Sequence, residues 1–414
     1  MTNASSPDTN EPSLINATPC ITVARALFTF ASRTVDSSSL QWRQKLSISL
    51  LQALRRTLNP RHTFAHSRQR LTGAAVEAYC RTRGLSYAAA AVDLPNNPFA
   101  DSFAPQVPRP TLHVVTPADA PVNGPTLLYA HGGGYLNPLQ APGHMPFALR
   151  CATSCGAARV VLIEYALTSE HPYPAQLIQM VAATKHLLNH PLPGADGDVG
   201  VRPRDLILAG DSAGGHLLAS LLAHVARPSP YAPPLTELGT EKGRQLRAVA
   251  LFSPWMGMTT TDASFTANHE TDYLSAQQMD VFIRLFEPPS PAEVWASPIE
   301  ADDAAAVWKA AFPRAAGGKP LDAAPVPLAR RMLITSGAGE TLFDSCVKFA
   351  RELLGADMVV LDSDDKVALV AGKELVFTMA PDEAHVQPVL DSALGYPNGW
   401  SMKAVDKFLQ STKQ

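Results

Sequence analysis

Residues 206–215 read LILAGDSAGG, and this stretch decides the interpretation of the rest of the chain. Its first four residues form an apolar run typical of a buried strand, and the alanine- and leucine-rich residues 215–226 that follow predict a helix. Between the two lies the pattern G-x-S-x-G, from Gly210 to Gly214. A strand–turn–helix context places the serine of this pattern on a sharp turn, with its hydroxyl exposed above the sheet. Ser212 is therefore predicted to be a nucleophile.

Similar apolar runs recur on both sides of this turn and predict the fold class. They cover residues 111–115, 126–130, 160–164, 206–209, 248–252, 332–335 and 375–379. Helical stretches separate most of them, as at 144–154, 174–189 and 215–226. Strands that alternate with helices and are apolar along their whole length indicate an α/β fold with a mostly parallel, doubly wound central sheet.

A glycine-rich segment follows the strand expected at 126–130 and reads HGGGY at 131–135. Acyl transfer needs fixed donors where negative charge develops on oxygen, and consecutive glycines let backbone N–H groups face inward without obstruction. We expect Gly132 and Gly133 to supply such donors, with the N–H of Ala213 as the third. A flexible hinge is the alternative, but a hinge has no need to follow a buried strand.

A serine nucleophile needs a base and an acid, which in this fold class follow it in the order acid, then base. His385 comes shortly after the last expected strand and is the only histidine beyond the acid candidates, so it is the predicted base. Glu340 is the first carboxylate after the strand at 332–335, and Asp344 comes one helical turn later. Glu340 is preferred as the acid, because Asp344 would more naturally face the following helix.

Composition excludes several classes of protein. The chain has 414 residues, of which 46% are hydrophobic and 17% charged, with a net charge of −3, and this excludes a mainly disordered chain and gives no sign of a nucleic-acid partner. No apolar run reaches the roughly 18 residues that a membrane-spanning helix needs. Cys151 and Cys155 lie four residues apart without a matching Cys/His pair, so we expect no metal site. Acyl transfer by a serine nucleophile implies no cofactor either. The sparse cysteines and the absence of a signal-peptide pattern favour an intracellular, cytoplasmic location.

The N-terminal quarter differs from this pattern. The expected organisation is a disordered tail at 1–18, a helical cap region at 19–105 and a catalytic domain at 106–414, with a cap segment and surface insertion at 257–328. A helix expected at 40–58 carries a leucine stripe among arginines and lysines and is interpreted as a cap helix. The alternative is a surface helix that makes weak peripheral contact with anionic lipid through residues 40–70.

Taken together, the motifs resemble those of the hormone-sensitive-lipase-like branch of the α/β-hydrolases over residues 111–410. They are HGGGY at 131–135, EHPYPA at 170–175, GDSAGG at 210–215, SPW at 253–255 and EAHVQP at 383–388. The resemblance implies an α/β-hydrolase fold with an N-terminal helical cap and a site made of Ser212, His385 and the three oxyanion-hole donors. The family commonly has Asp as its acid, and Glu340 takes that position here, as in similar fungal steryl acetyl hydrolases. An arginine usual before EHPYPA is missing, since Ala166 stands there.

These expectations amount to a serine carboxylic ester hydrolase that acts on short-chain acyl esters of a small molecule, acetyl esters above all, through an acyl-enzyme. Three aromatic residues next to the motifs are expected to line the substrate pocket: Tyr135, Trp255 and Phe252. Two alternatives stay open. One is an acyltransferase or lactonase in a biosynthetic pathway. The other is a ligand-binding protein without activity, like the plant gibberellin receptors that this branch resembles.

Overall fold

The computed structural model describes residues 26–32, 38–57, 69–94, 107–193, 199–313 and 326–413. They belong to two units, Met1–Phe64 and Ala65–Gln414. In the first unit, residues 26–32 are helical and helix α2 covers Trp42–Thr57, close to the helix expected at 40–58. The tail expected at 1–18 lies outside the described residues.

The second unit is built on a nine-stranded sheet in the order β1-β2-β4-β3-β5-β6-β7-β9-β8. The strands are β1 (Ser86–Ala91), β2 (Thr111–Thr116), β3 (Thr126–Ala130), β4 (Arg159–Glu164), β5 (Leu206–Asp211), β6 (Ala248–Phe252), β7 (Met332–Gly337), β8 (Asp357–Val360) and β9 (Leu375–Ala380). Strand β2 pairs antiparallel with β1 and β4, and all the other pairs are parallel. The predicted mostly parallel α/β fold is confirmed, and each of the seven expected strands is present with ends within two residues of those expected.

Two strands were not expected from the sequence. Strand β1 reads SYAAAA and β8 reads DMVV, and both lie at the edges of the sheet. Alanine has a low preference for strands, and both strands are partly exposed, so neither shows the continuous apolar run of a buried strand. Strand β1 and helix α3 (Gln69–Arg83) fall within 19–105, which the sequence assigns to the cap region, yet both lie in the second unit.

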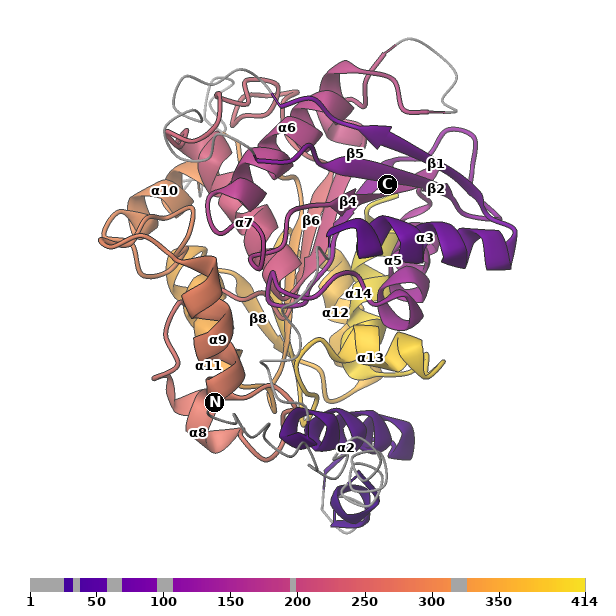
Figure 1. Cartoon of the computed structure of the whole chain (residues 1–414), viewed down its shortest axis with the longest axis vertical. Coiled ribbons are helices and arrows are strands. Elements are labelled where there is room, and N and C mark those ends of the chain that lie inside the picture. The colour runs from indigo at the N-terminus through magenta and orange to yellow at the C-terminus, as the bar shows by residue number, and fades with distance from the viewer. Residues whose placement is uncertain are drawn as a thin grey trace, which may run out of the picture. The chain divides into compact units, whose positions relative to one another are not determined.

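Helices cover both faces of the sheet (Figure 1). One face carries α3, α5 (Ala141–Cys155), α12 (Asp364–Leu369), α13 (Gln387–Ala393) and α14 (Trp400–Ser411). The other carries α6 (Ala175–Asn189), α7 (Ala213–Ala226), α10 (Ala304–Ala311), α11 (Phe343–Val347) and the π-helix η3 (Lys348–Leu353). Single 3₁₀ turns are η2 (Pro203–Asp205) and η4 (Val370–Gly372). Each face of the sheet buries its own hydrophobic cluster. The central strands lie between the two clusters, so their side chains are apolar on both faces.

The segment expected at 257–328 as cap and insertion contains α8 (Ala263–Ala267), α9 (Ala276–Phe286) and α10, and no strand in its described part. Helix α9 starts at a capping box, in which Ser275 and Gln278 each bond the other's backbone N–H. This fixes where α9 begins. Among the described helices of the whole chain, none is long and apolar enough to cross a membrane.

Candidate active site

Ser212 sits on the turn between β5 and α7 in a strained backbone conformation, with φ 50° and ψ −119°. A non-glycine residue adopts a positive φ only where the surroundings impose it. Here the end of β6 does so, because the Ser212 N–H donates to the Phe252 carbonyl at 2.9 Å and the Ser212 carbonyl accepts from the Trp255 N–H at 3.1 Å. The strained turn expected from G-x-S-x-G is therefore present.

Both flanking glycines are needed for this turn. A Cβ on Gly214 would lie 2.0 Å from the Ala130 carbonyl oxygen, and one on Gly210 would lie 2.9 Å from the same atom. A side chain at either position would push β3 away from the turn. The pattern is thus explained by close backbone packing.

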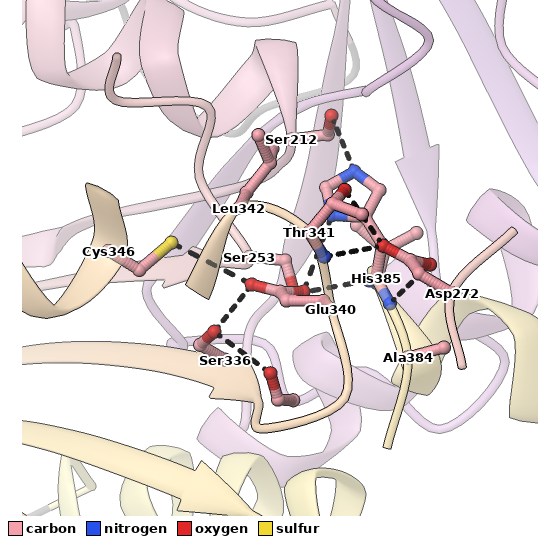
Figure 2. A network of polar contacts seen from close by, with 12 residues as sticks. Ser212, Ser253, Asp272, Ser336, Glu340, Thr341, Leu342, Cys346, Ala384 and His385 are labelled. Atoms are coloured by element: carbon pink, nitrogen blue, oxygen red, sulfur yellow. Dashed lines mark hydrogen bonds and ion pairs between the residues drawn. The ribbon is translucent and has the colours of Figure 1, made fainter. Parts of the chain in front are cut away.

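His385 stands between the serine and a carboxylate (Figure 2). Its Nε2 lies 2.9 Å from the Ser212 hydroxyl oxygen, and its Nδ1 lies 3.4 Å from Oε2 of Glu340. All three side chains are buried. The tautomer that fits both contacts carries its proton on Nδ1, which leaves Nε2 free to accept from the serine hydroxyl.

The electrostatics favour a protonatable His385. Burial on its own lowers the pKa of His385, but the hydrogen bond to Glu340 and the negative charges of Glu340, Asp272 and Asp211 outweigh burial, so the net pKa is raised. A raised pKa means that the imidazolium formed during proton transfer is stabilised where it forms.

The structure brings Glu340, and not Asp344, to the histidine. Glu340 is fully buried after β7, and its Oε1 accepts from the Ser336 hydroxyl. Asp344 instead accepts the backbone N–H of Ser264 at 2.8 Å, which ties α11 to α8. The two carboxylates differ by one helical turn, and only the first faces His385.

Asp272 is a buried carboxylate that no sequence motif marks. It accepts the backbone N–H of His385 at 3.2 Å and that of Thr341, next to Glu340, at 2.8 Å. Asp272 lies in the segment 257–328, outside the strand–helix alternation whose loops carry the predicted site residues. Only the folded chain brings it to the triad loops.

The glycine-rich segment lies beside the nucleophile. A Cβ on Gly132 would meet Ser212 Cβ at 3.0 Å and Asp211 Oδ2 at 2.2 Å. Gly133 has a φ of 118°. Within the described residues, no hydrogen bond engages the N–H groups of Gly132, Gly133 and Ala213, so all three can donate to a further group.

The carboxylate of Asp211 packs against the glycine-rich segment at Gly132. Its oxygens accept from the Tyr129 hydroxyl at 2.6 Å and from His144 Nε2 at 3.3 Å. The Gln140 N–H donates to His144 Nδ1, so Nε2 must carry the proton. Burial raises the pKa of Asp211, but His144, the Tyr129 hydrogen bond and His131 together lower it, and the net pKa is lowered. An ionised side chain is thus fixed against Gly132.

The three aromatic residues expected to line the pocket do not form one cluster in the structure. Tyr135 and Trp255 have ring centroids 6.0 Å apart, and Tyr135 also stacks on Phe286 at 5.0 Å. Phe252, in contrast, packs edge-on against Phe147 of α5, in the hydrophobic cluster of the opposite face. The structure therefore joins Tyr135 and Trp255 but not Phe252.

A polar contact also holds Tyr135 in place. Its hydroxyl donates to Nδ1 of His216 at 2.7 Å, and Nε2 of His216 donates to the Ala296 carbonyl at 3.0 Å. Burial lowers the pKa of His216 to about 4, so it stays neutral and keeps this pattern. The end of the glycine-rich segment is fixed to α7 as a result.

Phe282 of α9 is a residue that sequence reasoning missed. A Cβ on Gly134 would lie 2.5 Å from the Phe282 ring, so the ring lies directly against the glycine-rich segment. Its centroid is 6.5 Å from that of Trp255. The amphipathic pattern of α9 could have marked an apolar face but not the residue that reaches the site.

Gly132→Ala is expected to lower kcat for an ester by roughly 100-fold, the effect typical of losing one oxyanion donor. The added methyl group would meet Asp211 Oδ2 at 2.2 Å, so the segment must shift and displace its N–H groups. Steady-state kinetics on p-nitrophenyl acetate checks this. Gly372→Ala is a matched surface control, because Gly372 is exposed, nothing lies within 4 Å of the position of its Cβ, and its φ is not positive. Equal activities of the two variants would contradict the prediction.

Comparison with known proteins adds to this geometry. A family model described as alpha/beta hydrolase fold matches residues 127–354, more than half of the chain. The chain is 30% identical to carboxylesterase NlhH of Mycobacterium tuberculosis over 167 residues, which cover 40% of this chain and 46% of that protein. It is 22% identical to the gibberellin receptor GID1 of Oryza sativa subsp. japonica over 300 residues, or 72% and 74% of the two chains.

A crystal structure of an esterase from the bacterial hormone-sensitive lipase family has a similar fold. It superimposes with a TM-score of 0.53 at 19% identity, over 95% of this chain and 98% of the other. In sequence, the chain spans less than half the length of the carboxylesterase that it matches.

Proposed function

The chain belongs to the alpha/beta hydrolase fold family, and from that premise we propose that it is a serine carboxylic ester hydrolase of the hormone-sensitive-lipase-like branch. The observation that supports this activity most strongly is the unbroken chain of contacts from the Ser212 hydroxyl through His385 to Glu340. A nucleophile, a base and an orienting acid are the minimum set for acyl transfer through a covalent intermediate.

The proposed reaction has two halves. Ser212 Oγ attacks the ester carbonyl carbon while His385 Nε2 takes the hydroxyl proton. The C–O bond to the alcohol then breaks, and His385 returns the proton to the leaving alcohol. Water attacks the resulting acyl-enzyme, again with His385 as base, and the acid product leaves as Ser212 regains its proton.

The negative charge that forms on the carbonyl oxygen needs donors that are already in place. Gly132, Gly133 and Ala213 are the proposed donors, because Gly132 lies against Ser212, Gly133 and Ala213 are the next residues along their loops, and the three N–H groups donate to no other described residue. Each such donor typically stabilises the transition state by about 2.7–4 kcal/mol.

We further propose that the acyl group is short, with acetyl esters as good substrates. The half-buried ring of Phe282 lies against Gly134 and near Trp255, so bulky aromatic rings adjoin the segment that would hold the carbonyl. Each methylene that fits contributes about 0.8 kcal/mol of burial, but a chain that meets an aromatic wall gains nothing further.

The rate profile across p-nitrophenyl acetate, butyrate, hexanoate, octanoate and palmitate is expected to peak at or below hexanoate. Phe282→Ala should move the maximum toward longer chains, because it removes the ring at Gly134. Leu285→Ala, on the same helix, serves as the comparison variant. A maximum at palmitate for the unmodified protein, with a rise in rate above the micelle threshold, would make it a lipase.

Two alternatives use the same scaffold. An acyltransferase or lactonase would form the same acyl-enzyme, and product analysis with an added alcohol separates transfer from hydrolysis. A ligand-binding protein without activity would have no use for a complete serine–histidine–carboxylate set, so the contacts of Ser212, His385 and Glu340 favour catalysis.

Two further proposals concern the role of the N-terminal unit and the cellular location of the protein. We propose that α2 belongs to a cap and that the protein acts inside the cell on a small-molecule ester. Weak contact of residues 40–70 with anionic lipid stays a hypothesis, which liposome flotation at low and high salt tests.

A further inference from the structure

Asp272 occupies an unusual place between the triad loops. It lies between α8 and α9, and its side chain is fully buried. Its Oδ1 accepts the backbone N–H groups of His385 at 3.2 Å and Tyr273 at 2.8 Å. Its Oδ2 accepts the backbone N–H of Thr341 at 2.8 Å and its hydroxyl at 3.1 Å. A buried carboxylate with this many donors is held in one orientation.

Apart from the Tyr273 N–H, these donors come from the two loops that carry the acid and the base (Figure 2). Thr341 directly follows Glu340 in the loop after β7, and His385 lies in the loop after β9. One carboxylate therefore joins both loops through backbone donors. The backbone next to Glu340 and the backbone of His385 are thus bonded to the same side chain.

We propose that Asp272 is a positioning residue of the triad, which holds the Glu340 and His385 loops together and places a second negative charge beside the imidazolium of His385. This rests on the proposed function of the Ser212 site. Asp272 does not face Ser212 and takes no proton in the proposed reaction, so its role is exerted through His385.

Asp272 also links the triad loops to helix α9, which lies against the glycine-rich segment. Asp272 precedes the α9 capping box at Ser275 by three residues. The far turns of α9 carry Phe282, which lies on Gly134. A continuous stretch of chain from Asp272 to Phe282 thus runs from the base loop to the helix that adjoins the proposed oxyanion hole.

The charge of Asp272 should be visible in the titration of His385. The charged or titratable groups that face the imidazole are Glu340, Asp272 and Asp211, with the Tyr273 ring at 6.1 Å. Burial raises the pKa of Asp272 and the charge of Glu340 adds to this, while His385 and the N–H bonds of Thr341 and His385 lower it, with a net rise.

The sign of the expected change follows from these contacts. Negative charge near His385 raises its pKa, so removing the charge lowers that pKa. The base must be neutral to act, so the acidic limb of kcat/KM moves to lower pH in a variant without the charge. A loop that merely loosens would lower the rate without moving this limb.

The test compares Asp272→Asn with Asp344→Asn in the full chain. Asp344 is a carboxylate of the same loop region that bonds a backbone N–H but does not contact His385. Histidines labelled with ¹³C at Cε1 are titrated by NMR, and the His385 signal is assigned by its loss in His385→Gln. In Asp272→Asn the His385 pKa should fall by about one unit, as expected for one lost neighbouring charge.

Kinetics gives the second readout. Since one pKa unit corresponds to a tenfold change in an equilibrium constant, kcat for p-nitrophenyl acetate should fall about tenfold in Asp272→Asn, with little change in KM. Asp344→Asn should stay within about twofold of the unmodified protein, since its carboxylate is remote from the reacting atoms.

One outcome would overturn the proposal. An unshifted His385 pKa in a folded Asp272→Asn protein would, even with lost activity, make Asp272 a structural residue only. If Asp272→Asn does not fold, Asp272→Ser, which keeps one acceptor without the charge, should give the same fall in pKa. The NMR titration needs no substrate, so an unmodified protein without esterase activity would contradict the proposed function and still test Asp272.

Discussion

Replacing Ser212 with Ala is expected to lower kcat for p-nitrophenyl acetate by about a millionfold, the loss typical of removing a serine nucleophile. The hydroxyl is the atom that attacks, and it lies 2.9 Å from His385 Nε2, the atom that takes its proton. The fold should persist, because the strained turn is held by backbone hydrogen bonds to Phe252 and Trp255 and not by the hydroxyl. The melting temperature checks this.

A matched serine controls for the substitution itself. Ser220 is a buried serine on α7, and its hydroxyl donates to the His216 carbonyl one turn earlier. A fluorophosphonate probe should label the unmodified protein and Ser220→Ala, and should fail on Ser212→Ala. Labelling that survives loss of Ser212 would place the active serine elsewhere and remove the basis of the proposed reaction.

The sequence predicts the central strands well, because a parallel strand buried on both faces is a continuous apolar run. Strands β3 and β6 match their expected ranges at both ends. Strand β1 is not predicted because its alanines favour a helix over a strand. It is a strand only because it pairs with β2. Local pattern therefore fails where a strand is defined by its neighbour and not by its own burial.

Some residues of the candidate site could likewise be predicted from local sequence, and others could not. Ser212, Glu340 and His385 could be chosen because each follows a buried strand in the chain order of the fold class. Asp272 and Phe282 could not, since both come from the segment 257–328 and reach the site only through long-range contacts.

Phe252 illustrates a further limit of sequence reasoning. It is the last residue of β6, and successive side chains of a strand point to opposite faces of the sheet. Proximity to a motif in the sequence does not tell which face a ring takes. The ring lies against Phe147 of α5, away from the cluster of Tyr135 and Trp255.

Glu340→Gln is expected to lower kcat by roughly 10⁴-fold, as the loss of the orienting acid does in other serine hydrolases. Oε1 of Glu340 accepts from the Ser336 hydroxyl, and Oε2 faces Nδ1 of His385. Glutamine has only one acceptor oxygen for these two positions. If that oxygen keeps the Ser336 contact, the amide NH₂ faces Nδ1, which favours the tautomer with its proton on Nε2, toward Ser212. That tautomer cannot accept the serine proton.

The charge lost with Glu340 acts in the same direction. Its hydrogen bond and its negative charge both raise the pKa of His385, so Glu340→Gln should lower that pKa and destabilise the imidazolium that the reaction must form. Asp344→Asn removes a carboxylate four residues later that bonds Ser264 and leaves His385 untouched, so its kcat should change by no more than about twofold. Steady-state kinetics of the two variants on one ester decides between them. A larger loss in Asp344→Asn than in Glu340→Gln would move the acid one helical turn along the chain and would leave the contact between Glu340 and His385 without a catalytic role.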